Sequence, residues 1–232
     1  MAPVNTKNSP TGWGEPPELL DIVMDFFIDT DKYPECKPLV AQAQSLIESG
    51  KAPSIQTTGV PFSVRDKRPF KQLRMKILER YRNPYYAVGN CIHEGAHAVL
   101  NEEEGVPNVR FSGPGIQYDR ASRHLFPYGA RIDSDPQPDL VLDEHLVFRT
   151  TTILAAGGVA LKKYAGMLEV GDDQDYKQFR ACCTMTPELL RGKAPEDLWR
   201  RGKQNAATRL DRPETKSKIL AKVPLFLAQL YA

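Results

Sequence analysis

The sequence lacks several features that would place it in a common class of protein. No apolar run approaches the roughly 18 residues needed for a membrane span, and residues 1–10 contain no apolar segment typical of a secretory signal. We therefore expect no membrane span and a cytoplasmic location. The formal net charge is only +2, so composition gives no reason to expect nucleic acid as a partner, for which a basic stripe would be needed.

Cysteine is scarce, and its positions do not suggest a metal site. The four cysteines, Cys36, Cys91, Cys182 and Cys183, show no paired spacing of the kind that binds zinc. Reduced thiols in the core of a cytoplasmic protein are the simplest interpretation. A chemical site must therefore be sought among other residues.

Histidine is equally scarce, yet two of the four histidines form a recognisable pattern, His93-Glu94-x-x-His97. Residues four apart lie on the same face of a helix, so His93 and His97 can offer two imidazole nitrogens to one metal ion. Glu94 lies about 100° around the helix from His93. Its carboxylate is thereby placed beside the metal, where it can accept a proton from the attacking water. The pattern predicts a zinc site with Glu94 as the catalytic base.

The residues around this pattern predict a helix from about 84 to 104. Asn83 suits the N-cap and Pro84 the first helical turn. Gly105 and Pro107 are typical of a helix end. Apolar residues recur between them at helical spacing, which indicates a buried face.

Hydrophobic periodicity elsewhere predicts a mainly α fold (α+β) with a small β element beside the zinc helix. The basic residues of the helix at 68–82 are interpreted as a solvated face. Further helices are expected at 19–28, 37–48, 139–166 and 213–232, with others starting near Asp172, Pro187 and Pro195, and short strands within 109–118 and 124–133.

The same pattern suggests how the chain is organised. Residues 1–16 are rich in Pro, Gly, Asn and Thr, and we expect a flexible arm there. Residues 17–232 are expected to form a single domain. It would comprise an N-terminal helical extension (17–82), a zinc-site core (83–184) and C-terminal helices (185–232).

A catalytic zinc ion needs a third protein ligand, and spacing alone leaves this ligand open. The metzincin pattern is excluded because Leu100 and Glu103 stand where it requires glycine and histidine. The remaining candidates are Glu144, His145 and the acidic cluster Asp172, Asp173 and Asp175.

Three motifs, in order, resemble those of FtsH-type zinc metalloproteases. Residues 91–99 resemble the HEAGHA helix of that family, with Gly and Ala exchanged. Residues 153–160 are similar to its LGGRAAE segment, although Val159 and Lys162 replace its Arg and Glu. Residues 171–176 resemble its GAxxDL segment. The family's nucleotide-binding pattern, G-x-x-x-x-G-K-[ST], does not occur in this chain, and neither does its membrane anchor.

This resemblance implies a zincin-like helical protease domain in which Asp175 is the third zinc ligand beside His93 and His97. As a residue in the first turn of a helix, Asp175 would also be favoured in its ionised form. The implied function is zinc-dependent, ATP-independent endopeptidase activity on peptides or unfolded protein segments, unless a separate ATPase acts as a partner. The alternative is a non-catalytic FtsH-like binding or regulatory module.

Overall fold

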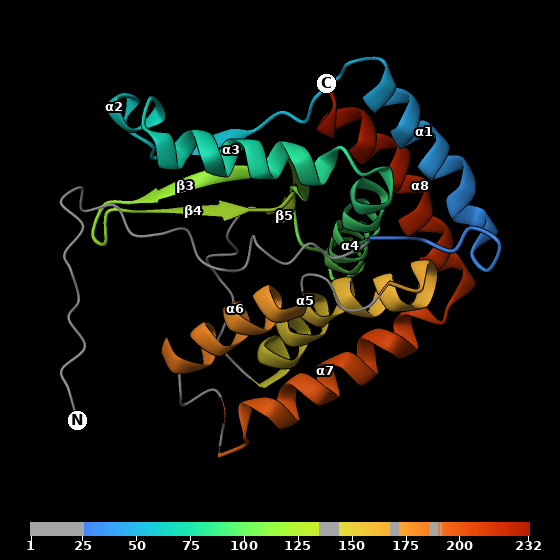
Figure 1. The fold of residues 1–232 in the computed structure, drawn as a ribbon. Coiled ribbons are helices and arrows are strands. Elements are labelled where there is room, and N and C mark those ends of the chain that lie inside the picture. The colour runs from blue at the N-terminus through green and yellow to red at the C-terminus, as the bar shows by residue number, and fades with distance from the viewer. Residues whose placement is uncertain (1–25, 135–143, 168–171, 186–189, 191) are drawn as a thin grey trace, which may run out of the picture.

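The computed structural model describes residues 26–134, 144–167, 172–185, 190 and 192–232 (Figure 1). Helices account for 64% of the described residues, which confirms the prediction of a mainly helical fold. The described elements are η2 (Pro34–Cys36), α1 (Lys37–Glu48), β1 (Gln56–Thr58), α2 (Phe62–Arg65), α3 (Arg68–Tyr81), α4 (Pro84–Glu103), β2 (Arg110–Ser112), β3 (Gly115–Asp119), β4 (His124–Tyr128), β5 (Arg131–Asp133), α5 (Glu144–Ala165), α6 (Asp172–Met185), α7 (Pro195–Leu210) and α8 (Pro213–Leu230).

Most helix predictions agree with the structure to within a residue or two at each end. α1 and α3 coincide with the helices predicted at 37–48 and 68–82, and Pro195 begins α7 as expected. The helix predicted at 19–28 is wrong for residues 26–28, which are not helical; its earlier part lies outside the described residues, as do Pro187 and residues 139–143.

The β element contains more strands than the sequence indicated. β3 and β4 lie in the two segments predicted to contain short strands, and they pair as an antiparallel hairpin. β1, from the N-terminal part of the chain, pairs parallel to β3 and gives the order β1-β3-β4. The segment at 109–118 is divided at Pro114, which has no backbone N–H to continue a ladder. Its first part, β2, pairs with β5 in a separate two-stranded sheet.

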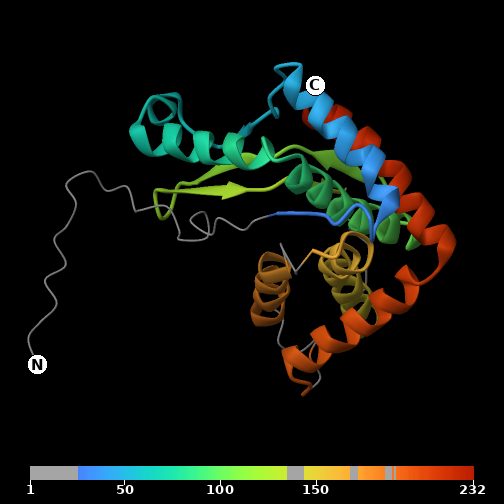
Figure 2. The same ribbon diagram turned by 45° about the vertical axis from the view of Figure 1, so that its right-hand side comes forward.

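Helix α4 is the central element of the fold. The Asn83 side chain accepts hydrogen bonds from the backbone N–H groups of Tyr85 and Tyr86 at 2.9 and 3.3 Å, which confirms the predicted cap. Gly105, at φ 71°, follows the end of the helix. Almost every residue of α4 from Tyr86 to Leu100 is buried, because α1, α5 and α8 all pack against it (Figure 2).

A small residue sets the close approach of α8 to α4. A Cβ atom at Gly95 would lie 3.2 Å from Cγ2 of Ile219, so the glycine allows the two helices to pack closely.

Helix α3 lies on the other side of the β element. It packs on β3 and β4, and both views show it on the opposite side of these strands from α5 and α6 (Figures 1 and 2). The motif His93-Glu94-x-x-His97 is therefore buried within α4 in the core of the fold, and it is not on a loop.

A second, smaller apolar cluster joins α5, α6 and α7. It comprises Ala155, Phe179, Cys183, Leu198 and Trp199. Cys183, like Cys36 and Cys91, is buried and forms no disulfide bond among the described residues. None of the helices among the described residues is both long enough and apolar enough to cross a membrane.

Candidate metal centre

Helix α4 places the two histidines of the motif one above the other, as four-residue spacing requires. Nε2 of His93 lies 2.9 Å from Nε2 of His97. Oε1 of Glu94 lies 3.9 Å from Nε2 of His93. All three residues are buried, with at most 7% of their surface exposed. Their ligand atoms form a group that could hold a metal ion.

Helix α5 orients both imidazole rings. The backbone carbonyl of Ile153 lies 2.8 Å from Nδ1 of His97. A carbonyl oxygen only accepts, so Nδ1 carries the proton and donates it. Nε2 of the same ring therefore keeps a lone pair free for a metal ion when the ring is neutral, the usual way in which a partner fixes the tautomer of a metal-binding histidine.

Gly157 makes room for the other ring. A Cβ atom at this position would lie 2.3 Å from Cε1 of His93 and 2.4 Å from its Nε2, so no larger residue fits. In a helix the carbonyl of residue 153 points towards residue 157. The missing side chain therefore also leaves the Ile153 carbonyl accessible to His97.

Helix α6 brings Asp175 to the same point. Oδ2 of Asp175 lies 3.1 Å from Nε2 of His93 and 3.4 Å from Nε2 of His97. Asp175 stands one turn before Phe179, which is buried against Trp199 of α7 with a ring-centroid distance of 5.4 Å. Residues four apart share a helix face, so the packing of Phe179 directs Asp175 inwards.

The spacing of these three atoms suits a single zinc ion. Ligands at 2.0–2.1 Å from a tetrahedral zinc ion lie about 3.3 Å from one another, and the three observed separations are 2.9, 3.1 and 3.4 Å. Oδ2 of Asp175 is buried and forms no hydrogen bond with the described residues. A buried carboxylate oxygen without a hydrogen bond is costly unless a cation neutralises it, so the donor set fits zinc.

The pKa values of the two carboxyl groups of the site are shifted in opposite directions. Burial raises the pKa of Glu94, although the charges of His93 and His97 oppose this effect. For Asp175, burial also favours the neutral form, but the two histidines outweigh it and hold the pKa below the usual range. Burial alone would lower the pKa of His97, but Asp175 raises it to about 9.

The sequence offered several candidates for the third metal ligand, and the structure distinguishes between two of them, Asp175 and His145. Asp175 lies against both histidines, whereas His145, near the start of α5, is exposed. The side chains of Glu144, Asp172 and Asp173 lie outside the described residues; the backbone places Glu144 at the start of α5, and Asp172 and Asp173 at the start of α6.

The sequence did not predict several groups that hold the side chains of the site in position. The Ile153 carbonyl is a backbone group, and a backbone hydrogen bond from Ile132 of β5 to the Glu94 carboxylate depends on a contact between distant segments. The pair Gly157-Gly158 was the one available signal, because glycines within a helix often mark close approach of another group. It did not indicate that this group is an imidazole ring.

The chain matches no known protein family, no curated protein and no solved structure. The assignment of a function therefore rests on the residues and their geometry.

Replacing Gly157 with alanine should abolish stoichiometric zinc binding. The added methyl group would overlap the His93 ring, which can escape only by leaving its position beside His97. Bound zinc is measured by elemental analysis after gel filtration. The matched control is Gly202→Ala. Gly202 lies on α7, and its added methyl group would come within 2.6 Å of Cγ2 of Thr151 on α5. This control therefore also crowds α5, but at its contact with α7 and away from the histidines. Both variants should lose stability, and equal zinc loss in both would contradict the specific role of Gly157.

Proposed function

We propose that this protein is a zinc-dependent endopeptidase, a zincin-like domain similar to the protease part of FtsH. It would cleave flexible or unfolded segments without ATP. The observation that carries the proposal is one buried cluster in which His93, His97 and Asp175 converge to within 3.4 Å of one another, with Glu94 beside them. A purely structural histidine pair would not need a buried carboxylate on each side.

The residues divide the chemistry between them. His93, His97 and Asp175 would hold the metal ion, and Glu94 would remain free of it. Zinc, when bound, would supply Lewis acidity, which polarises a peptide carbonyl and activates water near neutral pH. Glu94 would accept a proton from the attacking water and pass it to the leaving amine. Burial of the carboxyl group would keep the pKa of Glu94 raised, and the backbone hydrogen bond from Ile132, which by itself lowers that pKa, would hold the side chain in position.

A substrate segment needs a partner for its own backbone, and a free strand edge can provide one. β3 offers no free edge, because it is the middle strand of its sheet. β4 has no second strand partner among the described residues. Soon after β4 the chain reaches Ile132, next to Glu94. We therefore propose the free edge of β4 as the place where an extended substrate pairs.

The test is hydrolysis of an unfolded protein, such as reduced and carboxymethylated casein, without ATP. The zinc-loaded protein should cut it, a chelator should stop the cutting, and added zinc should restore it. Metal content is measured on the same samples. A protein that binds one zinc ion per chain but never cuts an unfolded substrate would support the non-catalytic binding module instead. A protein without zinc affinity would contradict the proposed peptidase and would leave only a binding module that works without metal.

A further inference from the structure

Positive charge is concentrated on one segment of this nearly neutral chain. Residues 62–82 contain eight Lys and Arg residues and two acidic residues, whereas the complete chain has 31 and 29. The segment therefore carries a charge of +6, and the rest of the chain together carries −4. This segment forms α2 and α3, which do not contribute a residue to the metal centre.

The fold turns this charge outwards. α3 buries its apolar face, including Phe70, Leu73 and Ile77, where it packs on β3 and β4. The exposed basic side chains on and before α3 include Lys67, Arg68, Lys71 and Arg74; Arg65 is exposed as well, but it donates a hydrogen bond to the Val60 carbonyl. Within the part of the chain that the structure describes, Lys67, Arg68, Lys71 and Arg74 form no ion pair with an acidic group, so they are available to an external anion.

Two exposed apolar side chains lie among these charges. Phe62, at the start of α2, is 80% exposed, and Met75 on α3 is 46% exposed. α2 projects from one extremity of the described structure in both views (Figures 1 and 2). Phe62 is the first residue of this projecting helix, and its exposed ring is therefore available to an approaching surface.

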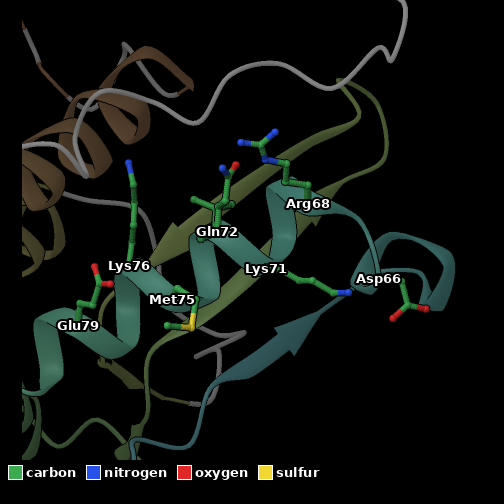
Figure 3. A pocket seen from close by; sticks show the side chains of 8 residues that line it. Asp66, Arg68, Lys71, Gln72, Met75, Lys76 and Glu79 are labelled. Atoms are coloured by element: carbon green, nitrogen blue, oxygen red, sulfur yellow. The ribbon is translucent and has the colours of Figure 1, made fainter.

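The outer side of α3 also borders a shallow hollow of about 600 Å³. Arg68, Gln72 and Lys76 follow one another along one side of the helix, while Lys71 and Met75 lie on the neighbouring side (Figure 3). Three cationic side chains line this hollow together with the acidic Asp66 and Glu79, so its lining keeps a net positive charge that can attract anionic headgroups.

We propose that the basic platform, defined here as Phe62, Lys67, Arg68, Lys71 and Arg74, docks on the surface of an anionic phospholipid bilayer. A bilayer surface satisfies both components of the platform. Its headgroups attract the lysines and arginines, and the apolar layer beneath them takes an exposed aromatic side chain. A phosphate backbone or a peptide made of acidic residues alone would satisfy the charges but would leave Phe62 without an apolar partner.

Docking in this orientation leaves the proposed active site accessible. The platform lies on the side of β3 and β4 opposite to α5 and α6, which carry part of the metal centre (Figures 1 and 2). A surface held against α2 and α3 would not cover Asp175. The inference does not depend on catalysis, since it concerns residues outside the metal centre.

The experiment is co-sedimentation of the zinc-loaded full chain with vesicles of phosphatidylcholine alone or with about 30% phosphatidylserine. Binding is expected only to the anionic vesicles, and it should be strong at about 0.05 M salt and weak at about 0.5 M salt. Arg68→Glu with Lys71→Glu should reduce binding at least about tenfold. Both changes place glutamate in the first turn of α3, where a negative charge favours the helix, so the fold should persist, as circular dichroism can check.

The matched control reverses two other exposed lysines, Lys37 and Lys51, and should bind like the parent. Phe62→Ser should weaken binding a few-fold at high salt, where the apolar contribution dominates. The proposal is overturned if the parent ignores anionic vesicles, if both charge-reversed pairs lose binding equally, or if an unstructured DNA oligonucleotide competes the protein off the vesicles at equal charge concentration.

Discussion

Asp175→Asn should lower the zinc affinity about 100-fold or more and remove proteolysis with it. The amide keeps the size of the carboxylate but loses its charge, and even an outer-shell partner of a metal ligand typically contributes about 10–100-fold in affinity. Oδ2 of Asp175 lies next to both histidine nitrogens, so removing its charge should lower the zinc affinity by more than that range. Affinity is measured by competition with a chromophoric chelator.

Thermal unfolding gives a second measurement that does not depend on activity. Zinc should raise the melting temperature of the parent, because a ligand that binds only the native state stabilises it. It should not raise that of Asp175→Asn at the same concentration. Asp197→Asn, an exposed aspartate paired with Arg200 on α7, and Glu144→Gln, the competing third ligand, should both behave like the parent. Lost zinc binding in Glu144→Gln with normal binding in Asp175→Asn would reverse the ligand assignment.

Glu94→Gln should keep zinc and lose about 10²–10⁴ in the rate of peptide hydrolysis. The amide preserves the shape of the side chain, and the three proposed ligands are untouched. It cannot accept the proton that a carboxylate accepts, so the loss should fall on kcat rather than on metal affinity. Single-turnover cleavage of a fluorescent unfolded substrate measures the rate, and elemental analysis measures the zinc.

Glu102→Gln is the matched control for this change. It alters the same functional group on the same helix, but at an exposed position where Glu102 pairs with Lys222 at 2.7 Å. It should retain parental rate and zinc content. Parental turnover in Glu94→Gln would remove this residue from the mechanism, and equal losses in both variants would point to a general effect on α4.

The local structure was predictable because it depends on neighbouring residues. The Asn83 cap, the glycine at the end of α4 and the apolar periodicity of α1 and α3 act within a few residues, and the structure agrees with each. The placement of His93 and His97 on one face of α4 follows from four-residue spacing alone. The β element was harder to predict, since β1 finds its partner β3 far along the chain and short strands carry little periodic signal.

The site shows the same division between local and long-range information. The sequence by itself determined that His93 and His97 share a helix face with Glu94 beside them, because helix geometry fixes those relations. Only the tertiary structure decided which group faces them: α5 brings the Ile153 carbonyl and the bare Gly157, and α6 brings Asp175. The physical reason is that these approaches depend on how three helices pack, and packing is set by Phe179, Trp199 and Ile219 on elements that no local pattern connects to the motif.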